Sequence, residues 1–118
     1  MIVEDSAIAA RKLAAMLDSM GHSTVIAANG AEAVEAYGRH RPDVVAMDIH
    51  MPGMGGVEAT RRILESHPEA AIVMVTSQGH ERMVIDAVAA GARGYVLKPV
   101  RPERLAAMLD KVTSGRRG

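Results

Sequence analysis

The sequence contains no cysteine, phenylalanine or tryptophan, and only two of its 118 residues are tyrosine. Without cysteine, the chain has no disulfide framework, no thiol nucleophile and no cysteine-based zinc site. Aromatic residues make up 2% of the chain and hydrophobic residues 48%, so a core has to be built from aliphatic side chains and the nine methionines. This hydrophobic content suits one packed globular domain.

The sequence also lacks an excess of either charge. Fourteen acidic and fourteen basic residues give a formal net charge of zero, whereas proteins that bind nucleic acids usually carry a basic surface. No apolar run approaches the roughly 18 residues that cross a membrane, and no signal-peptide pattern opens the chain. These absences predict a cytoplasmic protein with no direct nucleic-acid or membrane partner.

Short apolar runs alternate five times with longer segments of helical periodicity. The runs are residues 2–3, 24–28, 43–47, 71–75 and 95–97, and the helical segments are 6–20, 31–38, 57–66, 81–90 and 102–113. Apolar runs joined by helices are typical of parallel strands buried on both faces. The alternation predicts an open α/β sheet, because a closed barrel needs eight such units.

No linker or low-complexity segment divides the chain, which predicts a single domain over residues 1–118. The last five residues, 114–118, have the composition of a frayed tail or the start of a linker.

Polar residues follow four of the five apolar runs. Glu4 and Asp5 follow the first run, Asp48 the third, Thr76 and Ser77 the fourth, and Lys98 the fifth. Ligands of open α/β sheets bind outside the carboxyl ends of the strands. We therefore expect these side chains to meet at one edge of the sheet.

Taken singly, these residues have simpler interpretations. Asp5 could cap the following helix, Lys98 could be a solvated surface charge, and Thr76 could be a β-branched strand residue. Together they indicate chemistry, because clustered carboxylates raise one another's pKa unless a cation neutralises them. Oxygen ligands favour a hard ion such as Mg²⁺, and an ammonium group suits a transferred phosphoryl group. The set predicts a carboxylate nucleophile that forms an aspartyl-phosphate.

Five motifs carry a family resemblance. They are VEDS (3–6), PDVVAMDIHMPGMGG (42–56), VTSQG (75–79), VIDAVAAGA (84–92) and AGARGYVLKP (90–99). With them the chain resembles, from residue 3 to about 112, the receiver domains of two-component response regulators, and most of all the single-domain, CheY-like chemotaxis type. The resemblance implies a flavodoxin-like (βα)5 fold: a doubly wound, five-stranded parallel sheet in the order 2-1-3-4-5.

The resemblance also implies a phosphorylation site and a metal site. Asp48 would accept a phosphoryl group from a phosphohistidine of a sensor histidine kinase. Glu4, Asp5, Asp48 and the backbone carbonyl of His50 would hold Mg²⁺, or Mn²⁺ in its place. Glu4 stands where many relatives have aspartate, and we expect metal binding to tolerate this exchange.

Further residues would bind the phosphoryl group and transmit its arrival. Lys98 would pair with the carboxylate and then with the phosphoryl oxygens, while Thr76 and the backbone of Ser77 would hydrogen-bond the phosphoryl group. Tyr95 would swing inward at the same time. The surface formed by the fourth helix, fifth strand and fifth helix would thereby change between two states.

The resemblance assigns structural roles to Pro52, Gly56 and Pro99. Pro52 is expected to end the third strand and turn the chain away. The glycines at 53, 55 and 56 are expected to allow a tight turn that brings the carbonyl of His50 to the metal. Pro99 is expected to follow Lys98 through a cis bond.

Several functions remain open at this point. A chemotaxis regulator would bind a sensor kinase and a flagellar motor switch protein, whereas a receiver cut from a larger regulator would control an attached DNA-binding or enzymatic domain. An aspartate-nucleophile phosphatase is disfavoured, because His50 occupies the place of the second aspartate. A phosphate-cradling nucleotide site is disfavoured by the acids at 4 and 5. We expect no external substrate, only self-catalysed phosphorylation and dephosphorylation.

Two departures from the family pattern affect packing. We expect a monomer. The first strand has few residues before its acids, however, and a weakly anchored strand makes a domain-swapped or otherwise associated dimer the alternative. Val100 stands where many relatives have phenylalanine, so the packing after Pro99 is expected to be smaller.

Overall fold

In the computed structural model, which describes residues 1–114, five parallel strands form one sheet in the order β2-β1-β3-β4-β5. The strands are β1 (Ile2–Val3), β2 (Ile26–Ala27), β3 (Val45–Asp48), β4 (Ile72–Thr76) and β5 (Gly94–Leu97). The helices are α1 (Ala7–Ser19), α2 (Gly30–His40), α3 (Gly56–Ser66), α4 (Glu81–Ala90) and α5 (Pro102–Ser114). The predicted flavodoxin-like fold and strand order are confirmed.

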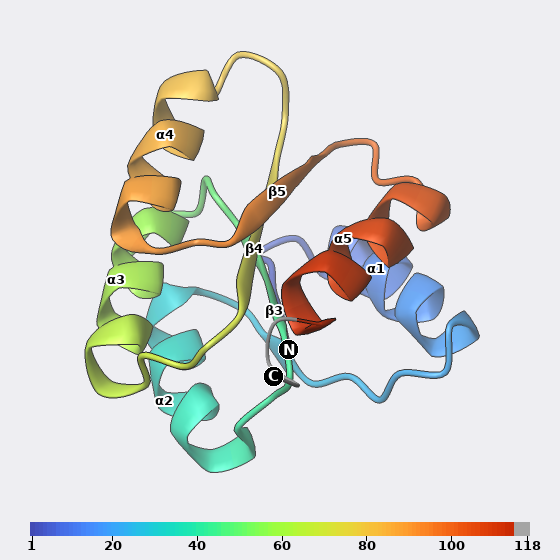
Figure 1. The fold of residues 1–118 in the computed structure, drawn as a ribbon, viewed down its shortest axis with the longest axis horizontal. Helices are drawn as coiled ribbons and strands as arrows, with labels where there is room; N and C mark the ends of the chain where they lie inside the picture. The colour runs from blue at the N-terminus through green and yellow to red at the C-terminus, as the bar shows by residue number, and fades with distance from the viewer. Residues whose placement is uncertain (115–118) are drawn as a thin grey trace.

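Helices cover both faces of the sheet. Figure 1 shows α2, α3 and α4 on one side and α1 and α5 on the other. Successive side chains of a strand point to opposite faces, so Val45 and Met47 of β3 belong to one buried cluster and Ala46 to the other. Both clusters are largely aliphatic, as the composition requires, and Tyr37 of α2 is a buried aromatic exception.

The two-residue strand β1 is bonded on both sides. Three hydrogen bonds extend its pairing: Ile2 N–H to Val25 O (2.8 Å), Glu4 N–H to Ala27 O (3.1 Å) and Ala46 N–H to Met1 O (2.8 Å). Ile2 and Val3 are fully buried between the helix layers. The strand is short, yet its position between β2 and β3 fixes where Glu4 leaves the sheet.

The predicted boundaries at the second apolar run and at the tail are wrong. The second apolar run, residues 24–28, forms a strand only at Ile26–Ala27, because β2 is an edge strand that pairs with β1 alone. Ser114 is the last residue of α5 and not part of a tail, since Val112 anchors the last turn in the core and Thr113 Oγ1 donates to Leu109 O (2.7 Å). Residues 115–118 of the predicted tail lie outside the described residues.

Pro52 does not end the third strand. The pairing of β3 with β4 stops at Asp48, opposite Val75, four residues before Pro52. The chain leaves the sheet there because α3 begins at Gly56, whose N–H donates to Ile49 O (3.2 Å) and draws the loop back. Gly53 has a positive φ of 74°, as a tight turn requires, whereas Gly55 has an ordinary φ of −74°.

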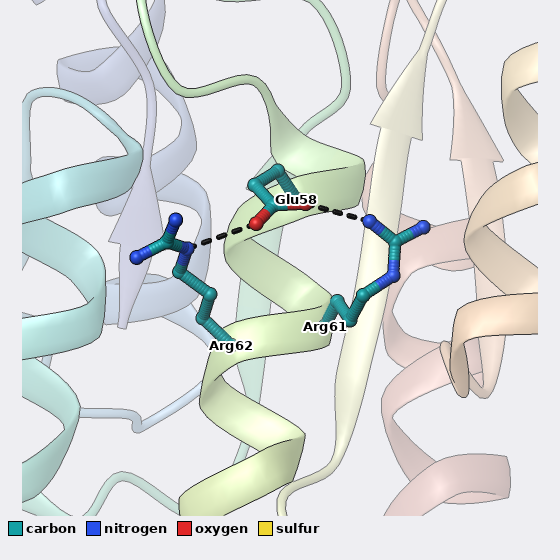
Figure 2. A network of polar contacts seen from close by, with 3 residues as sticks. All are labelled: Glu58, Arg61 and Arg62. Carbon is teal, nitrogen blue, oxygen red and sulfur yellow. Dashed lines mark hydrogen bonds and ion pairs between the residues drawn. The ribbon is translucent and has the colours of Figure 1, made fainter.

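The outer face of α3 carries a network of charged side chains. Figure 2 shows Glu58 of α3 between two arginines: Arg61 Nη1 donates to one carboxylate oxygen (2.6 Å) and Arg62 Nε to the other (2.9 Å). The guanidinium groups of Arg62 and Arg61 lower the pKa of Glu58. Pairs three and four residues apart lie on one helix face, so this network marks the solvent side of α3. Within residues 1–114, no helix is both long and apolar enough to span a membrane.

Gly56 lets the start of α3 touch the end of β3. A Cβ at this position would overlap the carbonyl oxygen of Asp48 and lie 2.9 Å from Cα of Ile49. The close approach involves backbone atoms, which cannot rotate away as a side chain can. Gly56 therefore positions the backbone of Asp48.

We predict that Gly56→Ala lowers the free energy of unfolding by about 1–3 kcal/mol, because the added methyl group displaces backbone. Gly38→Ala is the matched control: Gly38 lies in α2, and a Cβ there would approach nothing closer than His67 Nε2 at 4.0 Å. This change should stabilise the protein by about 0.5–1 kcal/mol. Urea denaturation measures both, and equal effects of the two changes would contradict the assigned contact.

Candidate functional site

Three carboxylates meet at the carboxyl edge of the sheet. Val3 pairs with Met47, so Glu4 and Asp48, each one residue later, leave neighbouring strands side by side. Side-chain oxygens of Glu4, Asp5 and Asp48 all lie within 4.8 Å of one another. Glu4 is 7% exposed and Asp48 6%, whereas Asp5 is open to solvent. The structure thus brings together the three acids that the sequence selected.

Lys98 supplies the positive charge of this cluster. Its Nζ lies 3.5 Å from Oδ1 of Asp48 and 3.6 Å from Oε1 of Glu4. The backbone N–H of Lys98 donates to the carbonyl of Thr76 (2.7 Å), which holds the end of β5 against β4. The bond between Lys98 and Pro99 is cis. The ammonium group therefore reaches both buried carboxylates from a strand that is not adjacent to either.

Glu4 is the acid whose protonation responds most to this environment. Burial raises the pKa of Glu4 from 4.5 to about 7, the hydrogen bond and charge of Asp48 add to the rise, and Lys98 opposes it. A proton on Glu4 near neutral pH partly relieves the repulsion between the acids. The cluster offers only oxygen ligands and carries excess negative charge, which fits a hard divalent cation such as Mg²⁺.

Asp5 does not cap the helix that follows it. Ser6 is the N-cap of α1, and its side chain accepts from the N–H of Ala9 (3.2 Å). The capping alternative raised for Asp5 is therefore wrong, and its carboxylate lies with the other two acids.

Thr76 ends β4 at the same edge as Asp48. Thr76 is 2% exposed, and its hydroxyl donates to the carbonyl of Ser77 (3.3 Å). Tyr95 of β5 is 46% exposed and points away from the core, and it lines a surface groove together with Thr76, Ser77 and Leu97. The groove connects the buried hydroxyl with the exposed ring.

His50 lies in the loop after β3, and its side chain is exposed. Its ring centroid is 5.7 Å from that of His80, which precedes α4. The sequence predicts a metal-binding role for the backbone carbonyl of His50 and gives no sign of this ring contact. The two histidines are 30 residues apart in the sequence and carry no shared motif.

A cavity lies beside the cluster of acids, and the sequence did not predict it. It holds about 230 Å³, and Leu13, Met16 and Val100 line it together with Asp48. The small Val100 after Pro99 was the one signal in the sequence, and it indicated only reduced packing. The lining comes from α1 and from the segment after β5, which the sequence alone does not place together.

The receiver-domain interpretation is confirmed by comparison with known proteins. The model of the response regulator receiver domain family matches residues 1–110, and the chain belongs to this family. It is 39% identical over 114 residues to the chemotaxis protein CheY of Thermotoga maritima, which covers 96% of this chain and 95% of that protein. It is 38% identical over 117 residues to the protein PilH of Pseudomonas aeruginosa, with 98% and 97% covered.

Solved structures agree with this assignment. The crystal structure of the Vibrio cholerae chemotaxis protein CheY4 superimposes with a TM-score of 0.87 at 29% identity, and the match covers 94% of each chain. The chain is thus a CheY-like receiver domain in both sequence and fold.

The raised pKa of Glu4 predicts a pH-dependent stability in the absence of divalent cations. The folded state holds a proton on Glu4 that the unfolded state has lost, so stability falls as pH rises from about 4.5 to about 7. Gln resembles the protonated acid at every pH. We expect the free energy of unfolding of the natural protein, relative to Glu4→Gln, to fall by about 1–2 kcal/mol over this range.

Urea denaturation in EDTA at several pH values measures this difference. Glu65→Gln, on the exposed surface of α3, is the control and should run parallel to the natural protein. If the curve of Glu4→Gln also ran parallel to that of the natural protein, burial would not raise the pKa of Glu4.

Proposed function

We propose that Asp48 is the phosphoacceptor of this receiver and takes its phosphoryl group from a phosphohistidine of a sensor histidine kinase. The observation that carries the proposal is a nearly buried carboxylate at the end of β3, 3.5 Å from the ammonium group of Lys98. A carboxylate oxygen of Asp48 attacks phosphorus, the P–N bond breaks, and the imidazole keeps the electron pair. The product is an aspartyl-phosphate.

Glu4, Asp5, Asp48 and the backbone carbonyl of His50 are the residues that would hold Mg²⁺ or Mn²⁺. The clustering of the three acids within 4.8 Å and the raised pKa of Glu4 support this assignment. When bound, the ion supplies positive charge that stabilises the oxygens of the transferred group.

Lys98 compensates the negative charge around Asp48 before and after phosphoryl transfer. Before transfer its ammonium group pairs with Asp48 and Glu4. After transfer the phosphoryl oxygens are the stronger partners, because they carry more negative charge. Thr76 and the backbone of Ser77 lie at the same edge and donate hydrogen bonds to the new group. Thr76 then gives up its present bond to the carbonyl of Ser77.

The output surface is formed by α4, β5 and α5. Large apolar side chains are exposed on its first two elements: Ile85, Val88, Tyr95 and Leu97. When Thr76 moves toward the phosphoryl group, space opens in the groove that it shares with Tyr95, and the ring turns inward. The apolar area that a downstream protein meets therefore changes with phosphorylation.

The similarity to proteins named as chemotaxis regulators supports a role in chemotaxis, with a flagellar motor switch protein as the downstream target. In this role the receiver works in the cytoplasm as a monomer and catalyses its own phosphorylation and dephosphorylation.

We predict that Asp48→Asn abolishes labelling by acetyl phosphate with Mg²⁺, because the amide has no nucleophilic carboxylate oxygen. Intact-protein mass spectrometry measures the labelled fraction. Asp110→Asn is the matched control, since Asp110 is an exposed residue of α5, and it should label like the natural protein. Full labelling of Asp48→Asn would sink the assignment.

We predict that Lys98→Ala can still be labelled at Asp48 but no longer passes the signal to the output surface. Amide NMR resonances of residues 81–114 should shift on labelling of the natural protein and stay in place in the variant. Arg39→Ala, which removes an exposed positive charge on α2 outside the output surface, should respond as the natural protein does. A normal response of Lys98→Ala would remove Lys98 from the switch.

A further inference from the structure

The cavity beside Asp48 is partly open to solvent and is lined mainly by apolar side chains, several of which come from two distant segments. Ala9, Leu13 and Met16 contribute from α1, and Pro99 and Val100 contribute from the segment between β5 and α5. Its volume is about 230 Å³. We refer to it as the α1 cavity. An apolar cavity of about 150 Å³ already binds a molecule the size of benzene, so the α1 cavity has room for a short aliphatic chain.

Charged residues also line the α1 cavity. They are Glu4, Asp48 and Lys98 of the acidic cluster and Lys12 of α1. The carboxylate that would accept a phosphoryl group therefore borders an apolar space. A donor molecule that places its phosphoryl group between Asp48 and Lys98 has an apolar surface available for the rest of its structure.

We propose that the α1 cavity binds the alkyl group of small acyl phosphates, so that this receiver prefers donors with a short aliphatic chain to acetyl phosphate. The proposal rests on the role of Asp48 as phosphoacceptor. In the step, a carboxylate oxygen of Asp48 forms a bond to phosphorus and the P–O bond to the acyl group breaks. The leaving carboxylate keeps the electron pair, and no proton has to move.

The size of the preference follows from the burial of apolar surface. Each methylene group transferred from water into an apolar site favours binding about fourfold. Butyryl phosphate has two methylene groups more than acetyl phosphate. When both are buried in the α1 cavity, kcat/KM for butyryl phosphate should exceed that for acetyl phosphate by about fifteenfold.

Initial rates of labelling of the full chain with each donor and Mg²⁺ test the proposal. The ratio of kcat/KM for butyryl to acetyl phosphate is divided by the ratio of their rates of spontaneous hydrolysis at neutral pH, a reaction that also breaks the P–O bond, which removes intrinsic differences between the donors. We expect a corrected ratio of about fifteen, and a ratio near one overturns the proposal. If acetyl phosphate does not label Asp48 at all, the proposed function itself fails, which is a distinct result.

Variants that fill the α1 cavity test whether the preference for butyryl phosphate arises there. Val100→Phe fills it from the segment after β5, and Ala9→Leu fills it from α1 without altering the residues next to Lys98. Both should lower the corrected ratio to near one, and either suffices if the other does not fold. Ala15→Leu makes the same change on an exposed position of α1 outside the cavity and should keep the ratio. Retention of the ratio in the filled variants overturns the proposal.

Discussion

The contacts of Lys98 with Asp48 and Glu4 are the interaction on which the rest of the site depends. Two carboxylates with less than a tenth of their surface exposed lie side by side at the ends of β1 and β3. Two buried like charges are costly without a partner, and the ammonium group at 3.5 and 3.6 Å is that partner. The compensation is incomplete, because the pKa of Glu4 remains raised to about 7. A further positive charge at this site would therefore stabilise the two carboxylates.

The fold supports this arrangement through its strand order. The order β2-β1-β3-β4-β5 places Glu4, Asp48 and Thr76 at the carboxyl ends of three neighbouring strands, and Lys98 just after the next strand, β5. Burial of aliphatic side chains on both faces holds the strands in register. Gly56 adds a local constraint, because α3 packs directly on the carbonyl of Asp48. Global topology selects the neighbours, and close backbone packing sets their distances.

The same edge of the sheet serves two kinds of surface. Charged groups collect over the central strands, while apolar groups lie exposed on α4 and β5 and line the α1 cavity. Because the domain has almost no aromatic residues, its apolar surfaces consist mainly of aliphatic and methionine side chains, and Tyr95 is an exposed exception. Thr76 and Tyr95 line one groove. In the proposed mechanism, phosphorylation of Asp48 changes the charge at the central strands, and this groove would carry the change to the apolar surface.

The sequence by itself determined the elements, because helical and strand periodicities are local, and it identified Asp48, Glu4 and Lys98 because each follows an apolar run. The strand order came from family resemblance, since periodicity does not specify which strands are neighbours. Only the tertiary structure decided the contact of Lys98 with both acids, the raised pKa of Glu4, the ring contact of His50 with His80 and the α1 cavity. Each depends on distances and burial between segments far apart in the chain, which no local pattern encodes.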